Sequence, residues 1–302
     1  MKMAVSDEAL QRYRRAGKIA AEVREYMRRT VSVEMPIIDI CEKTEALIRE
    51  KGGKPAFPCN VSINEIAAHY TSPPNDERTI PENSIVKIDI GAHVDGYIAD
   101  TAVTVCFNPE HDILVRTAEK ALKRGIETLH AGLSISTFGA TVQKTIQMCG
   151  CKPISNLTGH QLGRYLIHTG KSLPNISHFS IAKVNLGEIY AIEPFVTTPK
   201  AAGRIKSGRE ANIFRFLKRR SIKNVYAKQL LEFVLRNFRT LPFTERWLQN
   251  IVPSNHYEAA FTELLEKKVL MAYPIFVEAS KNPVAQAEHT VITTKDGCIV
   301  LT

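Results

Sequence analysis

The chain has 302 residues, of which 44% are hydrophobic and 24% are charged, a composition typical of a soluble globular protein. No run approaches the roughly 18 apolar residues that a membrane helix needs, and the N-terminal residues are too polar for a secretory signal. We therefore expect a cytoplasmic protein with no membrane partner. Nothing in the sequence requires more than a monomer.

The six cysteines are scattered along the chain and form no C-x-x-C pair, which argues against a zinc site or a disulfide framework. We expect reduced structural thiols. The Cys149-Gly150-Cys151 pair is a weak redox signal, for which inert thiols are the favoured interpretation.

The net charge of +9 is concentrated in one segment, residues 204–239. This segment holds eleven basic residues against the two acids Glu210 and Glu232, so it carries +9 and the rest of the chain is neutral. The basic residues are Arg204, Lys206, Arg209, Arg215, Lys218, Arg219, Arg220, Lys223, Lys228, Arg236 and Arg239. Such a segment is either a solvated helical face or a surface for an acidic partner such as RNA.

The first third of the chain predicts two helices and a β-hairpin. Apolar residues at helical spacing predict a helix over residues 6–31, with Ser6 as its N-cap. Pro36 is suited to open a second helix, which Gly52-Gly53 ends. Residues 84–107 are rich in Val, Ile and Thr around a turn at Val94-Asp95-Gly96, which predicts a hairpin.

The remaining elements alternate between helices and short strands. The expected elements are helices over 109–130 and 136–148, a strand over 187–196, a mostly helical stretch over 214–268, and strands over 269–277, 285–293 and 298–302. Pro283 has no N–H to donate, so the strand near it should begin at or after this residue. Antiparallel strand pairs with a helical piece inserted before the last strands indicate an α+β fold.

Four acidic residues lie in strand segments that otherwise suit a core: Asp89, Asp100, Glu193 and Glu288. Burying an isolated carboxylate costs several kcal/mol, so each must pair with a cation, share a proton or bind metal. Only Lys87 is a nearby base. A single such acid is readily explained as a strand end or a salt bridge, whereas four together favour a metal site.

His160 is the natural fifth ligand, because imidazole beside carboxylates suits first-row divalent ions. Four carboxylates and a neutral imidazole carry −4, which matches two divalent cations, with manganese, iron or cobalt favoured by the oxygen-rich set. Two such metals would generate hydroxide from a bridging water and stabilise the tetrahedral product of its attack on a carbonyl. The residues therefore predict metal-assisted hydrolysis.

Several motifs together are specific to one family. From about residue 5 to its C-terminus the chain resembles the type II methionine aminopeptidases, in the short form typical of archaea. The motifs are Phe57-Pro58, Ala67-Ala68-His69-Tyr70-Thr71, Lys87-Ile88-Asp89-Ile90-Gly91, Ile98-Ala99-Asp100, Leu157-Thr158-Gly159-His160, Ile167-His168-Thr169-Gly170-Lys171, Tyr190-Ala191-Ile192-Glu193 and Gln286-Ala287-Glu288-His289-Thr290.

The resemblance implies a pita-bread fold, a curved antiparallel sheet covered by helices with a small winged-helix-like insertion. Residues 1–200 and 269–302 would form the catalytic domain, and residues 201–268 the basic helical subdomain. It further implies that the protein removes the initiator methionine from nascent polypeptides whose second residue is small.

The resemblance also assigns the metal ligands. Asp100 and Glu288 would bridge two ions, Asp89 would chelate one of them, and His160 and Glu193 would bind the other. The ions would be cobalt, manganese, iron(II) or zinc. Glu193 would in addition handle the proton of the bridging water, as general-base logic allows.

The remaining site residues are implied in the same way. His69 would hydrogen-bond the scissile amide and His168 would contact the tetrahedral intermediate, so both are expected to be catalytic and to touch substrate. Phe57, Ile167, His168 and Tyr273 would line an apolar pocket for the methionine side chain.

Two other functions stay open. A non-catalytic relative of the same fold could bind RNA or ribosomes through residues 204–239, although such relatives have lost metal ligands that this chain keeps. An exopeptidase that cleaves X-Pro bonds shares the spacing between Asp89 and Asp100 and would be separated from a methionine aminopeptidase by its substrates.

Overall fold

The structure, a computed structural model, describes residues 5–302. Its helices are α1 (Asp7–Thr30), α2 (Ile37–Glu50), η1 (Pro109–His111), α3 (Asp112–Thr128), α4 (Ile135–Met148), α5 (Val225–Asn237), η2 (Glu245–Leu248) and α6 (Ser254–Glu266). Both N-terminal helices are where the sequence predicts them. The backbone N–H of Ala9 donates to Ser6 Oγ at 3.3 Å, which confirms the N-cap of α1.

The predicted hairpin is confirmed as β4 (Ile85–Val94) and β5 (Tyr97–Cys106), which pair antiparallel along their full length. Asp95 and Gly96 at its turn both have positive φ, at 51° and 87°, the backbone that matches the twist of the two strands. Strands β1 (Lys54–Pro55) and β2 (Asn60–Ile63) pair with the other edge of β4. Helices α1 and α2 pack with these strands into one apolar core.

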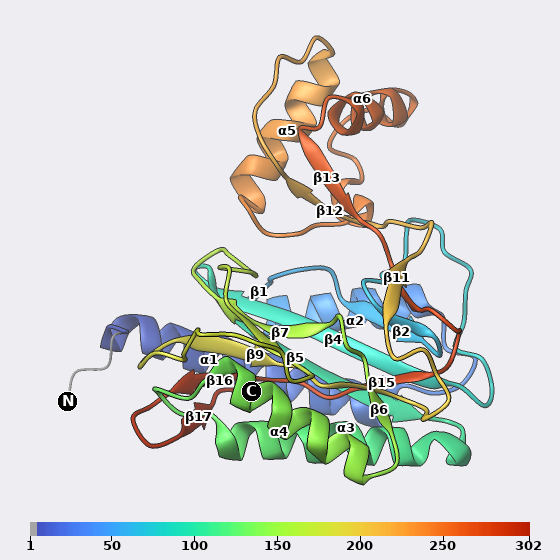
Figure 1. The fold of residues 1–302 in the computed structure, drawn as a ribbon. Helices are drawn as coiled ribbons and strands as arrows, with labels where there is room; N and C mark the ends of the chain where they lie inside the picture. Colours follow the sequence, from blue (N-terminus) through green and yellow to red (C-terminus); the bar gives the residue numbers. More distant parts are fainter. Residues whose placement is uncertain (1–4) are drawn as a thin grey trace.

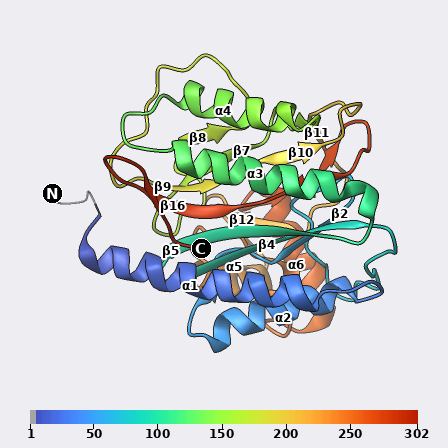
Figure 2. The same ribbon diagram turned by 90° about the horizontal axis from the view of Figure 1, so that it is seen from below.

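A second sheet runs in the order β17-β16-β9-β7-β8 and is antiparallel throughout. Its strands are β17 (Cys298–Val300), β16 (His289–Thr293), β9 (Ile189–Ile192), β7 (Thr158–Leu162) and β8 (Ser172–Pro174). Helices α3 and α4 form a second apolar core against it. In Figure 2 helices α1 and α3 cross in front of the strands, α4 lies beside α3, and α2 lies beyond α1, away from α3.

Two long predicted strands are broken. The strand expected over 187–196 divides into β9 and β10 (Phe195–Thr197) around Glu193-Pro194, and the one expected over 285–293 divides into β15 (Val284–Gln286) and β16 around Ala287-Glu288. β15 begins immediately after Pro283, as its missing N–H predicts. The breaks fall at the acidic residues Glu193 and Glu288. At each break the chain changes sheet, since β10 and β15 pair with each other and not with the larger sheet.

The insertion, which contains α5, η2 and α6, lies on the side of the body opposite to α3 and α4 (Figure 1). Helices α5 and α6 and the short helix η2 enclose an apolar core of their own. The stretch predicted to be helical begins instead with a strand, β12 (Ile213–Phe216), which pairs with β13 (Leu270–Tyr273). This prediction was wrong locally. Ile213 pairs with Tyr273 and Phe214 with Ala272, 60 and 58 residues away, and no local sequence pattern indicates such distant partners.

Residues near both predicted domain boundaries pair across them. β11 (Ile205–Ser207) joins β14 (Phe276–Glu278) and β3 (Ile66–Ala68) of the body, although it lies inside 201–268. β13 belongs to the sheet of the insertion, although it lies inside 269–302. The strand expected over 269–277 is accordingly split between the two parts at Pro274-Ile275. β6 (Lys152–Pro153) completes the small sheet of β10 and β15.

All six cysteines are free thiols, with Cys41, Cys59 and Cys151 buried. Within residues 5–302, no helix is both long enough and apolar enough to cross a membrane.

Candidate metal centre and active-site pocket

Three of the predicted ligands come together at the hairpin. Asp89 pairs with Ala102 across β4 and β5, and Asp100 lies two residues before Ala102, so the two acids are diagonal neighbours on one face. Glu288 reaches the same face because its backbone forms an antiparallel bridge with Ala102.

The other two ligands come from the second sheet. His160 on β7 pairs with Ala191 on β9, and Glu193 follows Ala191 by two residues, just beyond the end of β9. The Nε2 atom of His160 lies 3.4 Å from Oε1 of Glu193 and 3.7 Å from Oδ2 of Asp100. The site therefore lies where the two sheets meet.

Ligand atoms of Asp100, His160 and Glu288 all lie within 4.8 Å of one another, close enough to share one ion. Each of the three residues is buried. Nδ1 of His160 lies 2.8 Å from the carbonyl oxygen of Ile167, which can only accept a hydrogen bond, so Nδ1 carries the proton. Burial keeps the pKa of His160 well below its usual value, so Nε2 presents a lone pair toward the carboxylates.

The four acids oppose one another electrostatically. Burial raises the pKa of Asp89 to about 7. Burial, followed by repulsion from neighbouring carboxylates, raises the pKa values of Asp100, Glu193 and Glu288 well above the ordinary value. Without a cation the ionised forms are therefore strongly disfavoured.

Few hydrogen-bond donors of the protein reach the four buried carboxylates. Oδ1 of Asp89 and Oδ1 of Asp100 are buried and accept no hydrogen bond. The one nearby amine, Nζ of Lys87, donates instead to the carbonyl oxygens of Asn64 and Val284, at 3.2 and 2.8 Å. Gln286 donates to Oε2 of Glu288 at 3.1 Å. A lone pair of His160 and unpaired carboxylate oxygens facing one space fit divalent cations.

The metal-ligand candidates form the floor of a pocket of about 210 Å³. All ten residues predicted for the site line it: Phe57, His69, Asp89, Asp100, His160, Ile167, His168, Glu193, Tyr273 and Glu288. The sequence thus selected residues that the fold brings together from both sheets and from the insertion.

His69 follows β3 and has a φ of 67°, a left-handed conformation that costs a non-glycine residue free energy. Its ring packs on Phe276 at a centroid distance of 4.4 Å and edge-on against Tyr273 at 5.7 Å. Burial, followed by the proximity of His168, lowers the pKa of His69 to about 4, so the ring is neutral. Its Nδ1 atom is buried without a partner.

His168 stacks on His160, with ring centroids 4.2 Å apart and an angle of 48° between the rings. Burial lowers the pKa of His168, and the nearby Arg215 lowers it further. Both catalytic candidates are therefore neutral rings that can each donate one hydrogen bond and accept one.

The apolar wall depends on a glycine. A Cβ placed on Gly91 would lie 2.2 Å from Cε1 of Phe57, so a side chain at this position of β4 would displace the Phe57 ring. Phe57 is buried at the pocket wall.

Sequence reasoning missed several wall residues. Asn60, directly opposite Asp89 in the pairing of β2 and β4, lines the pocket with a buried Oδ1 that has no partner. The available signal was a polar residue beside Val61 in the short strand Asn60–Ile63. Phe195, Phe276 and Ile213 also line the pocket, and nothing in their local sequence separates them from ordinary core residues.

Comparisons with known proteins place these features in a family. Residues 11–223 match the metallopeptidase family M24. The methionine aminopeptidase of Methanothermobacter thermautotrophicus is 40% identical over 296 residues, which cover 97% of this chain and 98% of that protein.

Solved structures share the fold at lower sequence identity. The structure of a thermophilic Arx1 has a TM-score of 0.82 and 20% identity, and the match covers 99% of this chain and 91% of that one. A methionine aminopeptidase from Rickettsia prowazekii has a TM-score of 0.71 and 18% identity, with 100% and 99% covered. These likenesses confirm the predicted α+β pita-bread fold.

Proposed function

The chain belongs to metallopeptidase family M24, and from this premise we propose that it removes the N-terminal methionine of polypeptides by metal-dependent hydrolysis. The observation that carries this function is the convergence of four carboxylates and His160 at the floor of a pocket with an apolar wall. Relatives about 40% identical over nearly the full chain are methionine aminopeptidases, which favours this activity over an X-Pro exopeptidase or a non-catalytic binding protein.

We propose that Asp89, Asp100, His160, Glu193 and Glu288 would hold two divalent ions. A bound divalent metal supplies Lewis acidity, which makes water a nucleophile near neutral pH and polarises a carbonyl. The ions are cobalt, manganese, iron(II) or zinc, since all four accept carboxylate and imidazole ligands.

The protein's own groups handle the protons and the substrate. Glu193 takes the proton of the attacking water on a carboxylate oxygen and returns it to the nitrogen of the departing amine as the C–N bond breaks. His69, neutral and with an unpartnered nitrogen, hydrogen-bonds the scissile amide. His168 contacts the oxygen on which negative charge develops, where a positioned donor contributes most.

The wall of the pocket selects the substrate. Phe57, Ile167, His168 and Tyr273 present an apolar surface, which suits an unbranched thioether. We propose that the second residue of the substrate must be small, so that peptides beginning Met-Ala are cleaved and those beginning Met-Leu are not.

Release of free methionine from Met-Ala-Ser tests the function. Protein stripped with a chelator is assayed with and without Mn²⁺, Co²⁺, Fe²⁺ or Zn²⁺, beside Met-Leu-Ser and an Ala-Pro peptide. Metal-dependent release from Met-Ala-Ser alone is expected. Cleavage of the Ala-Pro peptide instead would assign an X-Pro exopeptidase, and a folded protein that binds no metal would favour the non-catalytic relative.

We also propose that the basic insertion contacts ribosomal RNA, which would bring the pocket near emerging N-termini. Arg219, Arg220, Lys228 and Arg236 line one hollow on the surface of the insertion. Among the described residues none of these four forms an ion pair, so their charge is available to phosphates.

Sedimentation with ribosomes tests this contact. Binding should weaken steeply as salt rises, and replacing Lys218, Arg219 and Arg220 by Glu should abolish it while peptide hydrolysis continues. Binding that survives the triple substitution would contradict the proposed surface.

A further inference from the structure

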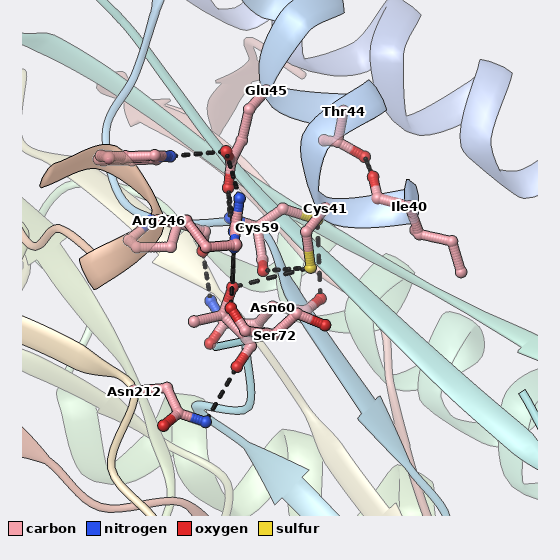
Figure 3. Close-up of polar contacts among 12 residues, drawn as sticks. Ile40, Cys41, Thr44, Glu45, Cys59, Asn60, Ser72, Asn212 and Arg246 are labelled. Carbon is pink, nitrogen blue, oxygen red and sulfur yellow. Dashed lines mark hydrogen bonds and ion pairs between the residues drawn. The ribbon is translucent and has the colours of Figure 1, made fainter. Parts of the chain in front are cut away.

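A buried ion pair joins the insertion to the catalytic body. Arg246 on η2 and Glu45 on α2 have side chains only 3% and 2% exposed. Nη2 of Arg246 donates to Oε1 of Glu45 at 2.7 Å, and Nη1 donates to Oε2 at 3.0 Å (Figure 3). This two-pronged geometry fixes the guanidinium plane as well as its position. We call the pair the Glu45–Arg246 brace.

The remaining donors of Arg246 hold the segment that follows His69. Its Nε donates to the carbonyl oxygen of Ser72 at 2.8 Å, and Nη2 also donates to Oγ1 of Thr71 at 3.2 Å. A second residue beyond the body, Asn212, donates from Nδ2 to the carbonyl oxygen of Thr71 at 3.1 Å (Figure 3). The backbone two and three residues after His69 is therefore tied to the insertion.

Glu45 extends the brace to the other wall of the pocket. Its Oε1 accepts a hydrogen bond from the backbone N–H of Cys59 at 3.3 Å, and its Oε2 accepts one from the indole of Trp247 at 2.6 Å. Cys59 lies between Phe57 and Asn60, which both line the pocket. One carboxylate thus connects helix α2, the Phe57 side of the pocket and the insertion.

The backbone conformation of His69 is one that neighbouring residues must stabilise. It is a non-glycine residue with a φ of 67°, and residues 69–72 belong to no helix or strand. A backbone in this region persists only where the surroundings hold it. Its buried Nδ1 makes no hydrogen bond, so the ring itself is oriented by packing on Phe276 and Tyr273.

We propose that Arg246 is a positioning residue that holds Thr71 and Ser72 so that His69 faces the scissile amide. Turnover then depends on the docking of the insertion against α2. A buried ion pair adds little net stability, so its main contribution here is geometric. This inference rests on the proposed catalytic role of His69.

A double-mutant cycle tests the proposal. Removing Arg246 alone would leave Glu45 buried and unpaired, so the variant to use is Arg246→Met combined with Glu45→Gln. This variant buries no net charge, and its amide oxygen can accept from Cys59 or from Trp247, which donate to different oxygens of Glu45. This variant is compared with the wild type in two backgrounds, one carrying His69 and one carrying His69→Ala. Arg246→Lys is added, because an amine keeps the charge and loses the two-pronged contact.

We expect the double variant to lose roughly 10–100-fold in kcat, with KM and bound metal little changed, since a small misplacement of a catalytic group has this cost. In the His69→Ala background the same substitutions should change kcat by less than about twofold, because the group they position is gone. An equal loss in both backgrounds would assign the brace to stability alone and overturn the proposal, as would full activity of the double variant.

Glu127→Gln is the control. Glu127 accepts from Arg124 at 3.1 Å in an exposed ion pair within α3, and neither side chain forms a hydrogen bond or ion pair with residues 69–72. It should leave kcat unchanged, and a comparable loss in this variant would contradict the specific role of Arg246.

A readout without turnover separates this proposal from the proposed function. In metal-free protein with labelled histidine, the His69 ring should give one set of NMR signals in the wild type and broadened or multiple signals in the double variant. Unchanged signals would overturn the brace. Absence of methionine release by the wild type, with unaltered His69 behaviour, would count against the proposed function instead.

Discussion

The ring of Phe57 lies so close to Gly91 that a Cβ on Gly91 would come within 2.2 Å of Cε1 of Phe57. Gly91→Ala must therefore displace this ring from the pocket wall. We expect KM for Met-Ala-Ser to rise about 10–200-fold, as for other changes of about one methylene in an apolar pocket, with a smaller effect on kcat. Steady-state kinetics measures this, and an unchanged KM would show that Phe57 does not contact methionine.

Substitutions of the metal ligands and of His69 should have different effects on metal binding. Asp100→Ala or Glu288→Ala removes a carboxylate that we assign to both ions, so each variant should bind neither metal after dialysis, measured by elemental analysis. His69→Ala should bind metal like the wild type and lose most of its turnover. If His69→Ala stripped the metals, our placement of His69 outside the ligand set would be wrong.

The placement of Asp89 and Asp100 follows from sequence because it depends on local rules. A strong hairpin turn sets the register, and strand alternation then puts both acids on one face. The buried acids Glu193 and Glu288 were detected by the mismatch between a charged residue and its apolar neighbours. The interruption of the strands at these two acids was not predicted, since it depends on β10 and β15 pairing with each other.

The Glu45–Arg246 brace is a contact that could not be predicted from the sequence. Its two residues are 201 positions apart, and each looks like an ordinary charged residue on a helix. Their burial results from the docking of the insertion against α2, which no periodicity or spacing encodes. The strand β12 was missed for the same reason, because its partner β13 lies at the far end of the insertion.

In the metal-free protein, the contribution of Asp89 to stability should fall as pH rises. Burial raises the pKa of Asp89 from 3.8 to about 7, so the folded state binds this proton more tightly than the unfolded state. Its contribution is fully present below about pH 4 and is lost as pH rises toward 7. The melting temperature of the wild type relative to Asp89→Asn, measured in chelator, should therefore fall as pH rises from 4 toward 7. Identical pH profiles of the two proteins would contradict the raised pKa.

The buried carboxylate of Glu278 gives the opposite dependence. It accepts hydrogen bonds from the backbone N–H and hydroxyl of Ser280, at 2.7 and 2.6 Å, and from the backbone N–H groups of Gly203 and Asn282, at 3.0 and 3.1 Å. Burial alone would raise the pKa of Glu278, but these donors outweigh burial and hold the pKa below its usual value. The ionised form therefore ties β14 to the loop that leads into β15.

Glu278→Gln should cost about 1–3 kcal/mol at neutral pH, because a neutral amide accepts these bonds less strongly. A group with a lowered folded pKa contributes stability above its unfolded pKa, and this contribution is lost as pH falls through the folded pKa. The difference in melting temperature between wild type and Glu278→Gln, measured in chelator, should therefore shrink as the pH is lowered from 7 toward 3. The exposed Glu210→Gln serves as the control. A difference that stays constant with pH would show that the substitution acts through packing and not through the charge of Glu278.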